Sequence, residues 1–201
     1  MQKLPRAFYD RDTVCAAREV LGTYLVRNLD GELLIGQITE SEAYVGRIDK
    51  ACHAYQYRRT ARNAVMFGPP GHAYIYQIYG MHHCLNLVTE PEGEPSAVLI
   101  RGIQPVYGID AMCRLRYGVP PDALTAYQKR NFSNGPGKLC RALDLNREQN
   151  GMDLAGDTLF LCSEIPELGL KACRPSGIRT SARIGIDYAE EAKDFPWRFY
   201  L

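Results

Sequence analysis

Hydrophobic and polar positions alternate most clearly between Gly71 and Thr89. In Tyr74–Tyr79 (YIYQIY) the alternation has a period of two, which predicts a β-strand. After Gly80, the apolar run Cys84–Thr89 predicts the returning strand of a β-hairpin. Tyr79 then lies at or beside the turn. There its ring either folds back onto the protein's own core or is held for a partner, such as stacked bases.

The rest of the chain predicts a mixture of short helices and strands. Asp12 or Thr13 can cap a helix that ends at Gly22, and Asp30-Gly31 marks a turn between two strands. The patterns predict strands at 23–27, 33–40 and 97–101, helices at 109–117 and 138–145, and apolar runs at 158–162 and 184–186. Because no repeat, low-complexity tract or linker interrupts the 201 residues, one domain is expected.

Composition changes this picture little. The values of 46% hydrophobic and 23% charged residues are ordinary for a globular protein with a full core. No apolar run approaches the roughly 18–20 residues of a membrane span, and the start, MQKLPRAFYDRD, lacks the apolar stretch of a signal peptide. The cysteines are odd in number, seven, and form no CxxC pair, which favours reduced thiols in a cytosolic or nuclear compartment. A soluble intracellular protein is expected.

Charge is more informative in its distribution than in its sum. The formal net charge is only +1, yet no acidic residue lies between Asp49 and Glu90. That segment holds four Lys or Arg and all four histidines, interleaved with aromatic residues. Cations and rings are what the phosphates and bases of a nucleic acid contact. A solvated Arg-rich loop over an aromatic core would have the same composition, so both interpretations remain open.

Two single residues have suggestive positions. Glu42 follows the strand at 33–40, and a carboxylate beside apolar strand residues can have a raised pKa and activate water. Most such carboxylates are simply solvated or ion-paired. Arg101 closes the strand at 97–101, where an Arg is well placed for a phosphate or a carboxylate.

The segment Asn134–Lys138 (NGPGK) invites comparison with a nucleotide-binding loop. A Walker loop needs Gly where this chain has Phe132, and Ser or Thr where it has Leu139, so that interpretation fails. The segment precedes a predicted helix whose free backbone N–H groups can hold a phosphate. Gly and Pro as plain helix punctuation explain the segment equally well.

Several motifs occur together along the whole chain. They are Glu42-Ala-Tyr44, Asp49–His53, Arg58–Asn63 with Met66-Phe67-Gly68, Tyr74–Asn86, Leu99-Ile-Arg101, Gly135–Cys140, Arg183–Ile186 and Arg198–Tyr200. In this order and spacing the chain resembles the alkyladenine (3-methyladenine) DNA glycosylase family, the Aag/Mpg type. It departs from that family at Ser41 and Cys52, where Thr and a smaller residue are expected. Cys52 adjoins His53 and could make a pocket sensitive to oxidation.

The resemblance implies a monofunctional enzyme of base-excision repair. Such an enzyme flips alkylated or deaminated purines (3-methyladenine, 7-methylguanine, hypoxanthine, ethenoadenine) out of duplex DNA and hydrolyses the N-glycosidic bond. It also implies an α+β fold, a single mixed domain over residues 1–201 around a curved, mostly antiparallel β-sheet, with a protruding β-hairpin that inserts into DNA. The implied catalytic residues are Glu42, which activates the water, and Arg101, near that water and the flipped nucleotide's phosphate.

Further roles follow from the same resemblance. Tyr79 would intercalate and fill the gap that the flipped nucleotide leaves. The base pocket would be formed by Tyr44, His53, Tyr76 and Asn86, of which Asn86 crowds the 2-amino group of normal guanine. The DNA backbone would be held by Arg59, Arg62, Met81, His82, Gly135 and Lys138. Electron-rich rings suit electron-poor alkylated purines, and no lysine adjoins the two central motifs, so lyase chemistry is not expected.

No cofactor is implied. The expected partner is double-stranded DNA containing a damaged purine, bound by a monomer and without a membrane. The expected location is the cytoplasm, associated with the nucleoid, in a bacterium, or the nucleus in a eukaryote. The sulfur and imidazole groups of Cys52, His53, His82, His83 and Cys84 raise a metal site as an alternative. Their spacing matches no common zinc pattern, so no metal is expected.

Two rival functions remain open. A non-catalytic DNA-binding protein could use the same aromatic hairpin as a stacking platform and would not need Glu42. A hydrolase of small nucleotides or nucleosides would need neither Tyr79 at a hairpin tip nor the cluster Arg58–Arg62, and its activity would not fall steeply with salt.

Overall fold

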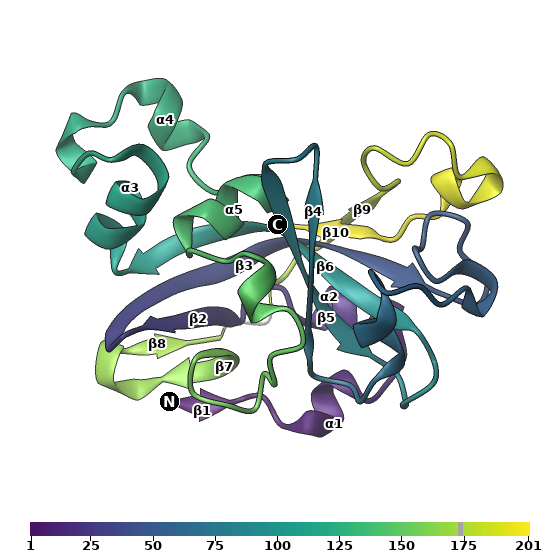
Figure 1. Ribbon diagram of the computed structural model, residues 1–201. Coiled ribbons are helices and arrows are strands. Elements are labelled where there is room, and N and C mark those ends of the chain that lie inside the picture. Colours follow the sequence, from purple (N-terminus) through teal and green to yellow (C-terminus); the bar gives the residue numbers. More distant parts are fainter. Residues whose placement is uncertain (173–174) are drawn as a thin grey trace.

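The long strand β3 (Glu32–Val45) is the centre of the structure (Figure 1). This computed structural model describes residues 1–172 and 175–201. One edge of β3 pairs with β2 (Tyr24–Leu29) and then with β10 (Arg198–Tyr200), and the other edge pairs with β6 (Ser96–Tyr107). Every strand pairing in the described residues is antiparallel, so the expected curved antiparallel sheet of an α+β fold is confirmed.

The other elements extend or cover this sheet. The remaining strands are β1 (Gln2–Lys3), β4 (Ala73–Ile78), β5 (His82–Thr89), β7 (Leu159–Ile165), β8 (Leu170–Lys171) and β9 (Arg179–Ser181). The helices are α1 (Arg6–Tyr9), α2 (Thr13–Glu19), α3 (Ile109–Tyr117), α4 (Ala126–Arg130) and α5 (Pro136–Ala142). Short 3₁₀ turns are η1 (Tyr55–Tyr57), η2 (Ala64–Phe67), η3 (Pro121–Ala123), η4 (Arg147–Gln149), η5 (Pro166–Leu168) and η6 (Glu190–Asp194).

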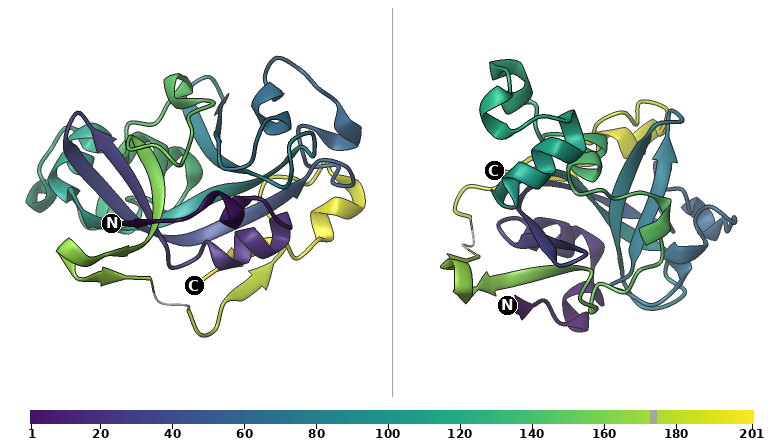
Figure 2. Two further views of the ribbon diagram at one scale, coloured as in Figure 1. Left: turned by 90° about the horizontal axis from the view of Figure 1, so that it is seen from below. Right: turned by 60° about the vertical axis from the view of Figure 1, so that its left-hand side comes forward.

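The core lies along the curled sheet. In the view of Figure 1, α2 lies behind the sheet and α5 in front of it, and Figure 2 shows the curl from two further sides. Side chains of α2 such as Ala17, of α5 such as Leu139 and of the strands such as Ile38 and Ile100 belong to one buried apolar cluster. Of the two predicted caps, Asp12 and Thr13, it is Asp12 that caps α2, because its carboxylate accepts the N–H of Cys15.

The predicted hairpin is formed by β4 and β5, and β4 is the edge of the sheet. The hairpin rises above the rest of the sheet in Figure 1. Ile78 pairs with His82, so the turn consists of three residues, and both Tyr79 and Gly80 have positive φ angles. A positive φ is uncommon for a residue with a ring. The turn therefore holds Tyr79 at the tip, as the sequence predicts.

Three predicted boundaries are wrong. β3 does not end before Glu42 but continues to Val45, and β6 does not end at Arg101 but continues to Tyr107. Beyond the predicted ends the apolar pattern is interrupted while the pairing continues, by Ser41 and Glu42 in β3 and by Gly102, Gln104 and Pro105 in β6. The helix predicted at 138–145 is found as α5, at Pro136–Ala142.

Candidate functional site

One row of side chains crosses five strands of the sheet. Tyr74 on β4 pairs with Asn86 on β5, which pairs with Leu99 on β6, then Glu42 on β3 and Arg198 on β10. Directly opposed residues of neighbouring antiparallel strands project to the same face of a sheet. The register therefore brings together residues that are far apart in the sequence.

An irregularity in the register lies beside this row. Glu40 pairs with Gly102 and the next residue, Ser41, pairs with Ile100, so Arg101 lies between two successive pairs. Such bulges often redirect a side chain next to a functional site. Here Arg101 donates from Nε to Glu40 Oε1 at 3.0 Å and lies 3.4 Å from Glu42 Oε1. Glu40 also accepts from Arg198 at 2.6 Å, so one carboxylate holds two guanidinium groups in place.

The Glu42 carboxylate is fully buried and held on both oxygens. Its Oε1 accepts the backbone N–H of Ile184 at 2.9 Å, and its Oε2 accepts the Tyr44 hydroxyl at 2.8 Å. Burial raises the pKa of Glu42 above the ordinary value, although Arg101 and the two hydrogen bonds act in the opposite direction. A carboxylate with a raised pKa holds a proton more strongly, which suits a general base.

The four predicted base-pocket residues line one small cavity of about 20 Å³. Its full lining is Tyr44, Ala51, Cys52, His53, Met66, Tyr74, Tyr76, Asn86 and Ala97. The His53 ring lies 4.6 Å from the Tyr76 ring, centroid to centroid, and its Nδ1 is 2.8 Å from the Tyr74 hydroxyl. The Asn86 amide donates to the Tyr74 carbonyl at 3.0 Å, which fixes its orientation. The cavity has room for about one water molecule.

His53 is the histidine that lines this cavity, and its charge state bears on which ligands the cavity can hold. Burial lowers the pKa of His53 to about 4, and the Arg62 cation lowers it further. The imidazole is therefore neutral around pH 7. An uncharged wall avoids repulsion of a cationic ligand and leaves the rings free to stack on it.

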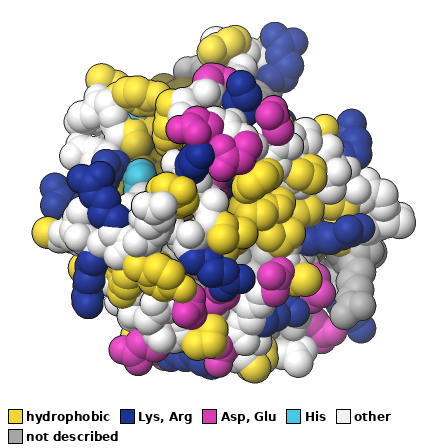
Figure 3. Space-filling view, turned by 90° about the vertical axis from the view of Figure 1, so that its right-hand side faces the viewer, with side chains coloured by type: hydrophobic (Ala, Val, Ile, Leu, Met, Phe, Trp, Pro, Cys, Tyr) yellow, Lys and Arg dark blue, Asp and Glu magenta, His cyan; other side chains and the backbone are white. Residues whose placement is uncertain are grey.

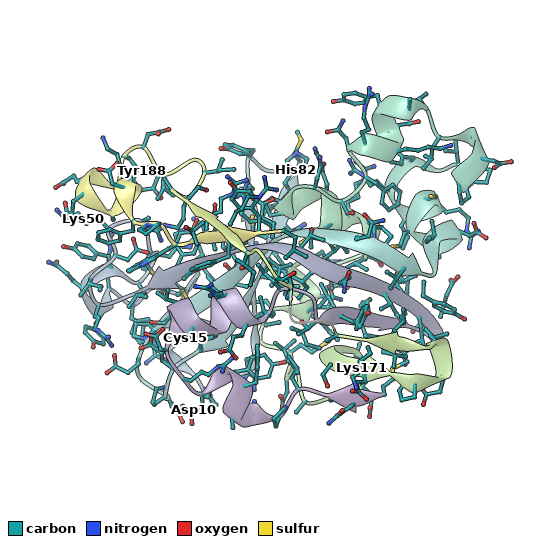
Figure 4. The ribbon with its side chains drawn as sticks, turned by 180° about the vertical axis from the view of Figure 1, so that it is seen from behind. Asp10, Cys15, Lys50, His82, Lys171 and Tyr188 are labelled. Atoms are coloured by element: carbon teal, nitrogen blue, oxygen red, sulfur yellow. The ribbon has the colours of Figure 1, made fainter. Side chains whose placement is uncertain are left out.

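The Tyr79 ring is 87% exposed at the hairpin tip, so the alternative in which it folds back onto the core is wrong. Met81 and His82 beside it are also exposed. The start of α5 lies close by, because a Cβ on Gly137 would meet the His82 side chain at 3.0 Å. Gly135 and Lys138 therefore lie next to the hairpin. Figure 4 shows His82 on the upper side of the molecule.

Arg59 and Arg62 are exposed but rest on aromatic rings. The Arg59 guanidinium lies 5.3 Å from the Phe67 ring and that of Arg62 lies 4.9 Å from the Tyr76 ring. Arg62 also donates to the Gln77 carbonyl at 3.2 Å. Figure 3 shows the side of the molecule that carries the 46–70 segment, with Lys and Arg side chains spread over its surface among Asp and Glu.

A buried ion pair, Asp49 with Arg183, contacts residues of the site, and the sequence did not predict it. Arg183 donates to both oxygens of Asp49, at 2.5 and 2.8 Å, and both side chains are fully buried. The Arg183 guanidinium also lies 4.6 Å from the Tyr44 ring, and the next residue, Ile184, is the one bonded to Glu42. The sequence signals were the motif matches at Asp49–His53 and Arg183–Ile186, and neither Asp49 nor Arg183 was given a role.

Several further features concern metals, thiols and membranes. Across residues 1–172 and 175–201, no group of three or more His, Cys, Asp or Glu side chains could hold a metal ion. Six cysteines are free thiols, and Cys173 lies outside the described residues. Burial raises the pKa of the Cys52 thiol to about 12, so it is protonated near pH 7.

Across the residues that the structure describes, no helix combines the length and the apolar character that crossing a membrane requires.

Comparison with known proteins identifies close relatives over nearly the whole chain. The family model described as "Methylpurine-DNA glycosylase (MPG)" matches residues 7–201. Proteins of Alkaliphilus oremlandii and of Clostridium perfringens (strain 13 / Type A) are each 48% identical over 99% of this chain and 95% of their own length. A protein of Bacillus cytotoxicus is 48% identical over 99% of this chain and 96% of its own. All three are named "Putative 3-methyladenine DNA glycosylase".

Proposed function

The chain belongs to the methylpurine-DNA glycosylase family, and we propose that it is a monofunctional DNA glycosylase that removes alkylated or deaminated purines from duplex DNA. The observation that carries this proposal is the buried Glu42 carboxylate, which accepts the hydroxyl of Tyr44, one of the aromatic residues that wall the cavity. This combination offers a base for water and a stacking site for a purine. Its substrates would be 3-methyladenine, 7-methylguanine, hypoxanthine and ethenoadenine.

In this proposal Glu42 takes a proton from a water molecule. The water oxygen forms a bond to C1′ of the deoxyribose while the bond from C1′ to the base nitrogen breaks, and its electron pair leaves with the base. The hydrogen bonds from Ile184 and Tyr44 orient the carboxylate. Arg101 supplies positive charge beside the carboxylate and the phosphate of the flipped nucleotide.

The flipped base would lie among Tyr44, His53, Tyr76 and Asn86. A 3- or 7-alkylated purine carries positive charge, so stacking on electron-rich rings and contact with a neutral His53 both favour it. The same positive charge makes the base a good leaving group, so little acid assistance is needed. The fixed amide of Asn86 would exclude the 2-amino group of normal guanine.

The duplex would be held along the hairpin and the start of α5. Arg59, Arg62, Met81, His82, Gly135 and Lys138 would contact its backbone while Tyr79 fills the gap in the stack. Lys138 is already oriented, because its Nζ donates to Asn134 at 2.8 Å. The exposed position of Met81, 71% accessible, suits contact with a groove wall.

Base release from a defined duplex tests the proposal. The substrate is a duplex carrying one ethenoadenine or hypoxanthine, and hot alkali afterwards converts each abasic site into a strand break. We expect breaks after alkali and none before it, since a water-using enzyme leaves the backbone intact. A wild-type protein that releases no base from these duplexes or from methylated DNA would contradict the proposal. Breaks before alkali would contradict its monofunctional part.

Substitution of Tyr79 tests the role of the hairpin. The Tyr79→Ser change removes an exposed ring and no core contact, so the fold should persist. A base–aromatic stack contributes about 1–3 kcal/mol, so we expect kcat/KM for base release to fall about 10- to 100-fold. The matched control is Tyr107→Ser, which removes a half-exposed ring at the end of β6. Equal rates for both variants would rule out intercalation by Tyr79.

A further inference from the structure

The helix α4 (Ala126–Arg130) is held at the surface without contributing to the core. None of its five residues is buried, and the Tyr127 ring is 69% exposed. The chain is anchored on either side of it instead, by the buried side chains of Leu124 and Phe132. A hollow of about 370 Å³ lies beneath the helix. Hydrophobic burial therefore gives no reason for the position of α4.

Polar contacts nevertheless fix α4 firmly. Thr125 and Gln128 form a reciprocal capping box at its start, and the Tyr117 hydroxyl donates to the Gln128 carbonyl at 3.4 Å. At its end, Lys138 Nζ donates to Asn131 Oδ1 at 3.0 Å. This last bond joins α4 directly to the segment Gly135–Lys138, which is proposed above to hold the DNA backbone.

The surroundings of α4 are basic. Between residues 109 and 145 there are six Lys or Arg and three Asp, a formal charge of +3, whereas the whole chain has +1. Lys129 and Arg130 are the charged side chains that line the hollow, with no carboxylate beside them. Within the described chain no ion pair involves either of them. Two unneutralised cations thus stand on a preorganised helix.

The position of α4 relative to the hairpin indicates a shared partner. Figure 1 and the right-hand view of Figure 2 both place α4 on the side of the sheet to which the hairpin tip projects. Figure 4 shows the same arrangement from behind, with His82 labelled near the hairpin. A duplex is a stiff rod with a phosphate about every 3.4 Å along each strand. DNA that receives Tyr79 and contacts Lys138 therefore extends over neighbouring surface on this side.

We propose that α4 is a second DNA-holding arm, in which Lys129 and Arg130 bind phosphates of the duplex on one flank of the lesion. The proposal rests on the proposed function, since it takes the bound duplex to be the substrate. It assigns the arm a role in holding undamaged flanking DNA, whose phosphates are the same for every sequence.

The test compares two double variants that remove the same charge. Lys129→Gln with Arg130→Gln neutralises the arm, and Arg18→Gln with Lys171→Gln neutralises exposed positions on α2 and β8. Lys171 lies at the lower side of Figure 4, far from His82. The probe is a duplex of about 25 base pairs with one ethenoadenine, and its affinity is measured at several salt concentrations. We expect the log–log salt slope to lose about two units in the arm variant and to be unchanged in the control.

Shortened duplexes locate the contact. Cutting one flank to about four base pairs removes most phosphates on that side. If the arm acts as proposed, cutting one particular flank weakens binding by the wild type. It also abolishes the difference in duplex affinity between the wild type and the arm variant. Cutting the other flank preserves that difference. The three duplexes are the full-length one and the two that are shortened on one flank or the other. A loss of affinity in the arm variant that is the same for all three would contradict a flank contact. Equal salt slopes for the two double variants would also contradict it.

Two further measurements, charge reversal of the arm and base release, distinguish failure of the arm proposal from failure of the proposed function. Lys129→Glu with Arg130→Glu repels phosphates, so its affinity should fall below that of the neutralised arm; an affinity at or above that level overturns the proposal. If the wild type shows arm-dependent binding but releases no base, the proposed function fails and the arm stands. If base is released and the arm variant binds like the control, the arm alone fails. A wild type that does not bind the duplex overturns both.

Discussion

The Glu42→Gln variant should release base from an ethenoadenine duplex about 10²- to 10⁴-fold more slowly than the wild type, measured in single-turnover experiments with excess enzyme. Gln has nearly the shape of Glu and can still accept the N–H of Ile184, but it cannot take a proton from water. Duplex binding should be retained, because the fully buried carboxylate lies below the surface that the duplex contacts. A non-catalytic binder would show no base release in either protein, and an unchanged rate would exclude Glu42 as the base.

The pH dependence gives an independent measure of the same group. Only the ionised carboxylate can accept a proton, and burial raises the pKa of Glu42 above its ordinary value. The wild-type rate should therefore fall as the pH decreases through that raised pKa, and should level off above it. The residual rate of Glu42→Gln should lack this titration. A titration shared by both proteins would have to be assigned to another group.

The Asp49→Ala variant should lose about 3–5 kcal/mol of unfolding free energy, the usual result when one partner of a buried ion pair is removed. The Arg183 guanidinium would remain buried among Ala43, Ala192 and two rings without the carboxylate to which it is bonded. Urea unfolding measures the change. Base release should fall as well, because a shift of Arg183 also moves Ile184, which holds Glu42.

The matched control is Asp157→Ala. Its contact with Lys3 is also 2.5 Å long, but the Asp157 side chain is 92% exposed. Exposed pairs contribute little, because water screens them and both side chains lose freedom. The control should unfold at nearly the same urea concentration as the wild type. If Asp49→Ala is equally well tolerated, the buried pair does not stabilise the site.

The sequence was sufficient to predict the parts of this protein that repeat a local pattern. The period-two run before Gly80 predicted β4 and the position of Tyr79, and the apolar spacing at Ile109–Tyr117 predicted α3 with its observed bounds. The four residues expected around the base do line one cavity. Their roles, and those of Glu42, Arg101 and the backbone contacts, remain predictions until the experiments above are done.

What the sequence did not predict depends on register and on long-range pairing. The bulge that redirects Arg101 toward Glu40 arises from the alignment of β3 with β6, and no local pattern encodes that alignment. Asp49 and Arg183 meet only because the C-terminal segment packs against the end of β3. The backbone N–H of Ile184 carries no side-chain signal at all, since every residue except proline has one.

If the cavity lined by Tyr44 holds the flipped base, as proposed, its size bears on how lesions would be distinguished from normal bases. At about 20 Å³ it holds about one water molecule, so no purine can enter until its walls move apart. In the proposed function the open form would be a minor population of the free protein, and the apparent affinity for any base would be reduced by that fraction. Every base would meet the same opening cost, but only one that stacks well on the rings would recover it. The closed cavity would thereby raise the threshold of binding energy for all bases alike, and undamaged purines, which gain least from stacking, would fall below it first.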